Sequence, residues 1–242
     1  MEIALSVVVP ALDEEAGIEA CVRAVAQVMD ASGLAWELVL VDDGSSDATW
    51  LRMRACAPPG STLIRLAATS GQQVALRTGL AHARGAARAT FDADLQFAPA
   101  CLPELARRVL AGAPLASGVR TARADGLVRR LPSALGNALT NLALGVRQSD
   151  FGGVKCYSAA LAARLLALPA GRLILPAAAF ALAGSFAEVP VAHAPRRTGR
   201  SKWPLWRRVA LLADIWTSAR TARSGTAARP SCAPAPAEVI RT

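Results

Sequence analysis

The chain has 242 residues, of which 53% are hydrophobic and 19% charged, and its formal net charge is +9. This length can bury one sizeable hydrophobic core or two small ones, and the composition excludes a disordered or fibrous protein. The positive charge indicates an anionic partner, which could be nucleic acid, a phosphorylated substrate or an acidic membrane surface.

The N-terminal part of the chain predicts strands that alternate with helices. Apolar runs predict strands at 3–9, 37–41, 63–66 and 89–91, and helical spacing predicts helices at 14–31, 45–56 and 72–87. Ser45 or Ser46 is the expected N-cap of the second helix. This alternation is typical of right-handed βαβ units, so we expect an α/β fold with a mostly parallel sheet flanked by helices.

Acidic residues follow three of these strands. They are Asp13, Glu14 and Glu15, then Asp42 and Asp43, then Asp92 and Asp94. Because ligands bind at the carboxyl ends of parallel strands, we expect the three groups to converge on one edge of the sheet.

The segment Asp92-Ala93-Asp94 carries two carboxylates one residue apart. In an extended chain the two carboxylates project to the same side. Because two negative charges at such a short distance repel each other, they favour a cation bound between them. Gln96 adds a neutral oxygen ligand, and hard oxygen ligands suit Mg²⁺ or Mn²⁺, which in turn suit a diphosphate. We therefore predict a metal–nucleotide site, with a solvated turn as the alternative for this triplet alone.

After Ala98 the pattern is less regular. We expect helices at 102–112, 132–145, 158–168 and 173–183, strands at 115–120 and 187–193, and an arginine-rich loop up to Arg130. The uncharged stretch 173–187 is shorter than the roughly 20 residues that span a bilayer, so we expect a buried helix and no transmembrane segment. The lack of a signal sequence and the scattered cysteines, without a CxxC pair, favour a cytosolic setting.

The segment 203–223 has an amphipathic pattern. Its apolar face contains Leu205, Trp206, Val209, Leu212 and Trp216, and basic residues lie next to it. Such a helix is expected to lie in a membrane interface, and docking on the protein's own core is the alternative. Residues 224–242 have the composition of a disordered tail.

Basic residues form two clusters. The first contains Arg120, Arg123, Arg129 and Arg130, and the second contains Arg196, Arg197, Arg200, Lys202, Arg207 and Arg208. Nucleic-acid binders interleave aromatic side chains for base stacking, and the first cluster has none. The clusters therefore favour phosphate sites, and we expect no nucleic-acid partner.

Five segments in order carry a family resemblance. They read Val-Pro-Ala-Leu-Asp-Glu-Glu at 9–15, Val-Asp-Asp-Gly-Ser-Ser-Asp at 41–47, Phe-Asp-Ala-Asp-Leu-Gln at 91–96, Asp-Phe-Gly-Gly at 150–153 and Arg-Arg-Thr-Gly-Arg-Ser-Lys-Trp at 196–203. The chain resembles the family 2 glycosyltransferases, in particular those that glycosylate polyprenyl phosphates. The resemblance implies a GT-A (Rossmann-like) catalytic domain at 1–202, an amphipathic membrane-interface helix at 203–223 and a tail at 224–242.

The resemblance also implies roles for individual residues. The nucleotide would be bound by Pro10, Asp13, Glu14, Asp42 and Asp43, and by Asp92, Ala93 and Ser201. The metal, Mg²⁺ or Mn²⁺, would be held by Asp92, Asp94 and Gln96. The catalytic set would be Asp94, Asp150, Arg120, Arg129, Arg196 and Lys202, in which the cations hold the donor diphosphate and the acceptor phosphate.

The implied reaction is an inverting transfer of a sugar from a UDP or GDP donor to undecaprenyl phosphate, at the cytoplasmic face of the inner membrane. The attacking phosphate oxygen is already anionic at neutral pH, so no general base is needed. This agrees with His82 and His193, which we expect to be structural. A separate membrane protein could replace the transmembrane helices that close relatives carry.

Two alternatives to this reaction remain. Transfer to a saccharide acceptor would need a base, for which Asp150 is the candidate, and a non-catalytic membrane-surface scaffold would bind no nucleotide. The chain also departs from the family pattern: it has Leu12-Asp13 where Tyr-Asn is usual, and its segment 68–72 reads Ala-Thr-Ser-Gly-Gln where Arg-Asn-x-Gly-Lys/Gln is usual.

Overall fold

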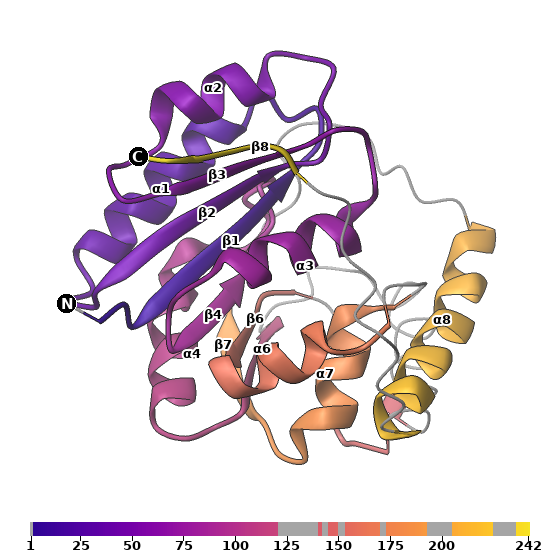
Figure 1. The fold of residues 1–242 in the computed structure, drawn as a ribbon. Coiled ribbons are helices and arrows are strands. Elements are labelled where there is room, and N and C mark those ends of the chain that lie inside the picture. The colour runs from indigo at the N-terminus through magenta and orange to yellow at the C-terminus, as the bar shows by residue number, and fades with distance from the viewer. Residues whose placement is uncertain are drawn as a thin grey trace.

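The computed structural model describes residues 2–120, 140–141, 145–149, 153–169, 173–192, 205–224 and 236–242, with the backbone alone at 205–212. In these residues an eight-stranded sheet has the strand order β7-β5-β6-β4-β1-β2-β3-β8 (Figure 1). The strands are β1 Leu5–Ala11, β2 Trp36–Asp42, β3 Thr62–Leu66, β4 Ala87–Thr90, β5 Leu115–Arg120, β6 Lys155–Ser158, β7 Ala187–Val191 and β8 Pro236–Arg241.

The four strands β4, β1, β2 and β3 run parallel to one another. β1 is buried along its whole length, which explains its continuous apolar run. β6 pairs antiparallel with both β4 and β5, while β5 and β7 are parallel. The predicted α/β fold with a mostly parallel sheet is therefore confirmed.

Helices cover both faces of the sheet. One core joins the sheet to α1 Ile18–Asp30, α2 Thr49–Cys56 and α4 Leu102–Leu110, which the short 3₁₀ turn Pro99–Cys101 precedes. The opposite core contains α3 Gln72–His82, α6 Ala159–Leu166, α7 Leu175–Ala183 and α8 Leu205–Ser224. This three-layer arrangement leaves the two ends of the strands as the places where loops can build a site.

Helix α7 is the buried helix expected within 173–187. Its buried residues include Leu175 and Phe180, and Pro176 lies in its first turn, where proline is tolerated. Within the described residues, no helix combines the length and the apolar character needed to cross a membrane.

Helix α8 occupies the segment predicted to be amphipathic. In its described half, Ile215, Ser218, Ala219 and Ala222 are buried, and the helix lies against α7. Trp216 is 54% exposed on the other side. Docking on the protein's own core thus accounts for one side of this helix, and contact of the other side with a membrane stays a prediction.

Two expectations need correction, and one strand was missed. The second helix begins at Thr49 rather than at 45, because the Ser45 and Ser46 side chains bond to Asp13 instead of capping it. The short strand β6 was not predicted. The disordered tail expected over 224–242 is wrong for residues 236–241, which pair antiparallel with β3 as β8 and cover an otherwise open sheet edge.

Candidate active site

The predicted acidic groups do converge on one edge of the sheet. β1 ends at Ala11, β2 at Asp42 and β4 at Thr90, and these strands are parallel neighbours in the order β4-β1-β2. The loops after these strands therefore leave the sheet side by side, with Asp42 at the end of β2 and with Asp13 and Asp92 just after β1 and β4. This arrangement is the usual position of a ligand site in an open α/β sheet.

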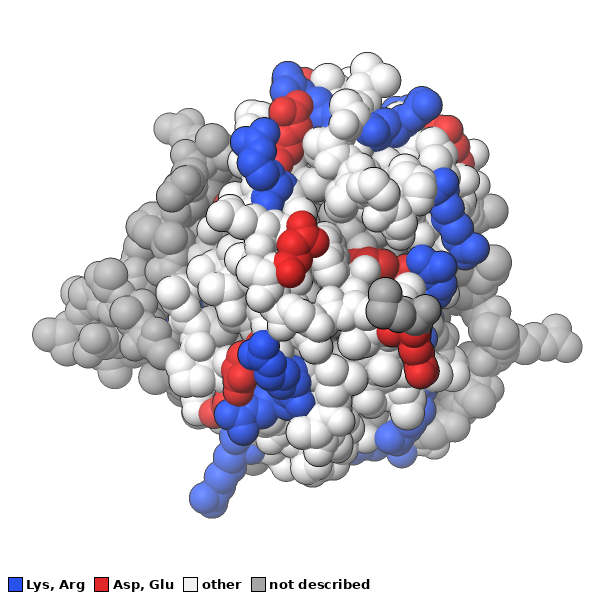
Figure 2. All heavy atoms as spheres, turned by 90° about the vertical axis from the view of Figure 1, so that its left-hand side faces the viewer, with Lys and Arg blue, Asp and Glu red and all other residues white. Residues whose placement is uncertain are grey.

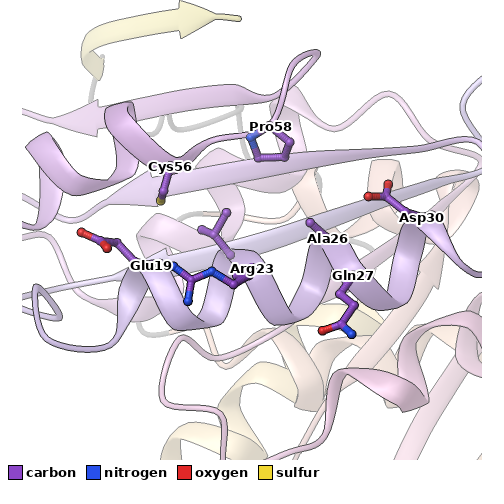
Figure 3. A pocket seen from close by; sticks show the side chains of 8 residues that line it. Glu19, Arg23, Ala26, Gln27, Asp30, Cys56 and Pro58 are labelled. Atoms are coloured by element: carbon purple, nitrogen blue, oxygen red, sulfur yellow. The ribbon is translucent and has the colours of Figure 1, made fainter.

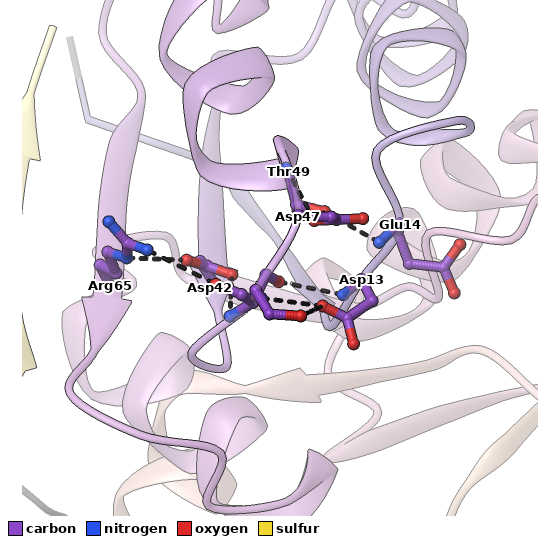
Figure 4. Close-up of polar contacts among 8 residues, drawn as sticks. Asp13, Glu14, Asp42, Asp47, Thr49 and Arg65 are labelled. Carbon is purple, nitrogen blue, oxygen red and sulfur yellow. Dashed lines mark hydrogen bonds and ion pairs between the residues drawn. The ribbon is translucent and has the colours of Figure 1, made fainter.

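Asp42 is a fully buried carboxylate at the end of β2. Its Oδ1 accepts a hydrogen bond from the Ser45 backbone N–H at 3.0 Å, and its Oδ2 lies 3.2 Å from Arg65 Nε (Figure 4). The Arg65 guanidinium also lies over the Trp50 ring, 5.8 Å from its centroid. Asp42 thus fixes the loop after β2 and holds a cation at the edge of the predicted base pocket.

Asp43 anchors a second loop. Its two carboxylate oxygens accept hydrogen bonds from the backbone N–H groups of Ser70 and Gly71 at 2.8 and 2.9 Å. Burial raises the pKa of Asp43 above its usual value, and these two hydrogen bonds act in the opposite direction. The contacts of Asp43, which the resemblance assigns to nucleotide binding, tie the end of β2 to the start of α3.

Gly44 lets the two loops approach each other. Its φ is +73°, and a Cβ atom at this position would lie 2.7 Å from backbone atoms of Ala68 and Thr69. Only glycine combines this backbone conformation with this clearance.

The loop after β1 is bound to the loop after β2. Asp13 Oδ1 accepts from the Ser46 N–H at 2.9 Å, and the Glu14 N–H donates to Thr49 Oγ1 at 2.9 Å. Asp13 itself has a φ of +52°, which aspartate tolerates better than most residues. In Figure 4 the Glu14 side chain points away from Asp42. Pro10 is buried in β1 beneath these loops.

Glu15 and Asp47 also join these two loops. Glu15 Oε2 accepts from the Ala48 N–H at 3.0 Å, and the Glu15 N–H donates to Asp47 Oδ2 at 3.2 Å. Asp47 also accepts from the Thr49 N–H at the start of α2, so it still serves that helix. Both carboxylates are thus part of the loop framework.

The Asp92-Ala93-Asp94 segment follows β4 directly. Asp92 is exposed, Ala93 is buried, and Asp94 and Gln96 are half-buried. Asp92 Oδ1 accepts from Gln72 Nε2 at 2.9 Å, and Asp94 Oδ1 accepts from the Gln96 N–H at 3.2 Å. The two carboxylates therefore accept hydrogen bonds from different residues.

The charges of Asp92 and Asp94 both act on the Cys21 thiol. Burial raises the pKa of the Cys21 thiol to about 12, and the negative charges of Asp94 and Asp92 contribute in the same direction.

The predicted metal ligands Asp92, Asp94 and Gln96 offer hard oxygen atoms, so they fit Mg²⁺ or Mn²⁺ rather than a soft metal. Among the described residues, no three His, Cys, Asp or Glu side chains are close enough to hold a metal by themselves. The predicted site therefore depends on Gln96 and on oxygens from the ligand.

The predicted phosphate-binding residues are placed only in part. Arg120 is half-buried at the end of β5. Outside the described residues lie Arg123, Arg129, Arg130, Asp150, Arg196, Arg197, Arg200, Ser201 and Lys202. Their roles stay predictions.

Three polar residues near this edge were not predicted to take part. Gln72 contacts Asp92 as described above. The departure of segment 68–72 from the family pattern was the signal in the sequence that could have drawn attention to it. Lys155 is buried in β6 opposite Thr90, with Nζ 5.8 Å from the centroid of the Phe180 ring. Glu188 accepts from the N–H and the hydroxyl of Ser149, the residue before Asp150, at 2.6 and 2.7 Å.

A separate hollow of about 540 Å³ lies between α1 and the end of α2 (Figure 3). Glu19, Arg23, Asp30 and Cys56 are among its lining residues, and none of the predicted site residues that the structure describes lines it. It lies on the outer side of the helix layer, whereas the candidate site lies where the strands end. The candidate site is therefore identified by the acidic side chains at the carboxyl ends of the strands and not by the size of a hollow.

Comparison with known proteins points to the same family as the motifs. The profile described as "Glycosyl transferase family 2" matches residues 6–160. A protein of Pseudomonas aeruginosa named undecaprenyl-phosphate 4-deoxy-4-formamido-L-arabinose transferase is 34% identical over 221 residues, which is 90% of this chain and 65% of that protein. Its namesake in Shewanella sediminis is 33% identical over 222 residues, 90% of this chain and 67% of that protein.

Solved structures share the fold. Glucosyl-3-phosphoglycerate synthase from Mycobacterium tuberculosis in complex with UDP has a TM-score of 0.66 at 24% identity, covering 89% of this chain and 80% of that one. The same enzyme with Mn²⁺, UDP-glucose and phosphoglyceric acid has a TM-score of 0.64 at 26% identity, with coverages of 89% and 79%.

Proposed function

This chain belongs to glycosyl transferase family 2, and from this premise we propose that it transfers a sugar from a nucleotide donor to a polyprenyl phosphate. The observation that carries the proposal is that Asp13, Asp42 and Asp92 lie at or just after the carboxyl ends of three neighbouring parallel strands. The relatives named as undecaprenyl-phosphate transferases support the acceptor class. The chain spans 65% of the length of the first of these relatives, so the full activity is inferred from this shared part.

The nucleoside of the donor binds between the loops after β1 and β2. Pro10, Asp13 and Glu14 form one side of this pocket, and Asp42 and Asp43 form the other. A carboxylate can accept a hydrogen bond from a base N–H or a ribose hydroxyl. The carboxylates of Asp42 and Asp43 already accept bonds from the loops, so their contribution is to fix the pocket's shape.

A divalent ion completes the donor site. Asp92, Asp94 and Gln96 would hold Mg²⁺ or Mn²⁺, and Ala93 gives the backbone of this segment a buried anchor. When bound, the ion neutralises charge that develops on the departing nucleoside diphosphate. The structural neighbour crystallised with Mn²⁺ and UDP-glucose supports this assignment.

Cationic side chains bind the phosphates. Arg120, at the end of β5, would face the diphosphate or the acceptor phosphate together with Arg129, Arg196, Ser201 and Lys202. The planar guanidinium suits two phosphate oxygens at once. The acceptor oxygen is anionic before it attacks, so direct displacement at the anomeric carbon inverts the configuration without a protein base. The Nδ1 atom of His82 is hydrogen-bonded to the Thr78 carbonyl in α3, which agrees with a structural role.

A second candidate acceptor is a soluble phosphorylated acid. The likeness to glucosyl-3-phosphoglycerate synthase at 26% identity favours this alternative, because that enzyme was crystallised with phosphoglyceric acid. The site for donor and metal would serve either acceptor, but an attacking hydroxyl of the acid would need a general base, for which Asp150 is the candidate. A lipid acceptor would in addition require peripheral contact with a membrane, which we place at the cytoplasmic face.

The test is sugar transfer from a panel of UDP- and GDP-sugars, with and without Mn²⁺, to undecaprenyl phosphate or to 3-phosphoglycerate. We expect Mn²⁺-dependent lipid product. The variant Asp94→Asn should lose activity by roughly a hundredfold or more, because charge stabilisation in the transition state is lost. Asp30→Asn is the matched control, since Asp30 is an exposed aspartate on α1 that accepts from Trp36 Nε1. Product from 3-phosphoglycerate but none from undecaprenyl phosphate would establish the second candidate. Product from neither acceptor, despite measurable nucleotide binding, would refute both candidate functions.

A further inference from the structure

The start of α3 bridges the nucleotide pocket and the metal segment. In the sheet, β1 separates β2 from β4, so the carboxyl ends that carry Asp43 and Asp92 are not adjacent. Residues 70–72 contact both of them. One short turn thus connects the two halves of the proposed donor site.

The β2 side of this bridge is fixed by Asp43. Both of its oxygens are bonded to consecutive backbone N–H groups, of Ser70 and Gly71, at 2.8 and 2.9 Å. Gly71 has a φ of +97°, a conformation that favours glycine, and α3 begins at the next residue. The position of Gln72 in the first turn of α3 is therefore determined by a residue of the nucleotide pocket.

The β4 side of the bridge is the hydrogen bond from Gln72 Nε2 to Asp92 Oδ1, at 2.9 Å. Asp92 and Asp94 are like charges one residue apart, and Asp92 is exposed, so its carboxylate needs a partner to keep one rotamer. A carboxylate that binds a metal loses affinity when the group that orients it is removed.

We propose that Gln72 is a positioning residue, which orients the Asp92 carboxylate for the divalent ion and links that orientation to the nucleotide pocket through Asp43. This inference rests on the proposed function, and it adds a residue that the resemblance did not assign. Gln72 does not contact the reacting atoms in this role; it acts through Asp92.

The neighbouring Gln73 provides a matched comparison. Its Oε1 accepts a hydrogen bond from the Leu175 N–H at the start of α7, at 2.8 Å, so it joins two helices. Gln72 and Gln73 thus share residue type and helix turn, but only Gln72 contacts a carboxylate of the proposed metal segment. A purely structural role for Gln72 would give the two variants similar consequences.

The experiment measures Mn²⁺ binding by electron paramagnetic resonance, with MnCl₂ alone and with saturating UDP or GDP, together with thermal unfolding. Gln72→Ala should weaken Mn²⁺ binding about tenfold with an unchanged melting temperature. Gln72→Leu should give the same loss, because it keeps side-chain bulk but has no N–H to donate. Gln73→Ala should lower the melting temperature and leave the Mn²⁺ affinity unchanged.

The outcomes separate this inference from the proposed function. Equal Mn²⁺ affinity in wild type and both Gln72 variants would overturn the positioning role while leaving the metal site intact. A drop in melting temperature that accounts for the loss of Mn²⁺ binding would also overturn it. Failure of the wild-type chain to bind Mn²⁺ under any of these conditions would overturn the metal site itself, and the positioning role with it.

Discussion

Gly44 shows how one residue determines whether the candidate pocket can form. The loop after β2 must pass close to residues 68 and 69, and a side chain there would collide with backbone atoms at 2.7 Å. Backbone atoms cannot rotate away as a flexible side chain can, so the loop that Asp43 anchors would have to shift. The pocket therefore depends on the absence of a Cβ atom as much as on the carboxylates around it.

We expect Gly44→Ala to weaken nucleotide binding and to destabilise the protein. Gly33→Ala is the control, because Gly33 has the same φ of +73° and, apart from its chain neighbours, no atom of the described residues lies within 4 Å of the position that a Cβ would take there. The control should cost about 1 kcal/mol from the backbone conformation alone, and Gly44→Ala should cost clearly more. Urea unfolding and calorimetry with UDP and GDP would measure both effects. Equal costs for the two variants would contradict the steric argument.

The raised pKa of the buried Cys21 thiol leads us to expect a loss of stability at alkaline pH. Its pKa in the folded protein is raised to about 12, so it stays protonated where an unfolded thiol, with a pKa near 9.0, ionises. Its contribution to stability is complete below the unfolded pKa and is lost as the pH rises from about 9 towards 12. The loss approaches about 1.4 kcal/mol per pH unit in that window.

Urea unfolding at pH 7.5, 9.5 and 10.5 measures this dependence. Cys21→Ala should have a flatter decline of the unfolding free energy with pH than the wild type, whatever its stability at pH 7.5. Cys56→Ala is the comparison, because Cys56 is half-buried and its thiol is less strongly perturbed. A Cys21→Ala curve parallel to that of the wild type would show that this thiol ionises normally in the folded state.

At the level of elements, the pairing of α8 with the domain depends on a buried hydroxyl. Ser218 is 1% exposed, and its Oγ accepts a hydrogen bond from the Ile174 N–H at 2.9 Å while it donates to the Asp214 carbonyl. The Ile174 N–H precedes the first turn of α7 and has no helical partner of its own there. Ser218 therefore joins α8 to the start of α7.

Ser218→Ala should lower the unfolding free energy by about 1 kcal/mol or more, since it leaves the Ile174 N–H without its partner. Thr217→Ala is the neighbouring control. The Thr217 hydroxyl is exposed and, among the described residues, donates to the Ala213 carbonyl of its own helix, so this change should stay within about 0.5 kcal/mol. Chemical unfolding of both variants provides the measurement, and equal effects would show that the Ser218 contact adds nothing.

The sequence predicted those elements whose signal is local. The apolar runs that became β1 to β4 and the helical spacing of α1, α3 and α4 identified elements close to the observed ones. β6 was missed because it has only four residues and leads directly into α6. β8 was missed because its alternation is short and follows a stretch rich in proline and alanine, so its pairing with β3 decides its structure.

The same distinction holds within the site. The acidic strand ends were predicted because the position after a parallel strand is itself the signal. The start of α2 was misplaced because Ser45 and Ser46 bond to Asp13, which is 32 and 33 residues away. The contact between Gln72 and Asp92 spans 20 residues and joins the first turn of α3 to the segment after β4. No periodicity in a single sequence encodes such pairings, so they required the structure.

For the whole molecule, the distribution of charge matters more than the net value of +9. On the face shown in Figure 2, basic and acidic side chains lie next to one another instead of forming one basic field. Ion pairs such as Arg52–Glu19 at 3.0 Å contribute to this pattern. A surface of this kind has little attraction for an anionic membrane, so membrane contact would have to use another part of the molecule.

Helix α8 offers a more suitable surface. Trp216 is 54% exposed on it, and the Arg220 guanidinium lies 5.4 Å from the centroid of the Trp216 ring. An exposed tryptophan beside arginine is typical of a helix that lies in a membrane interface. The burial of Ile215 and Ala219 against the rest of the protein would hold the Trp216 side in a fixed orientation.

We therefore expect the protein to bind vesicles that contain acidic phospholipids more tightly than neutral vesicles. Raising the salt concentration should weaken this binding, because charges are screened beyond about 10 Å at 0.1 M salt. Trp216→Ala should reduce affinity about tenfold, equivalent to about 1.4 kcal/mol. Leu51→Ala is the control, since Leu51 is 66% exposed on α2, away from α8. Vesicle sedimentation measures the affinity in each case. An equal loss of affinity in both variants would mean that hydrophobic exposure in general, rather than the α8 surface, governs membrane contact.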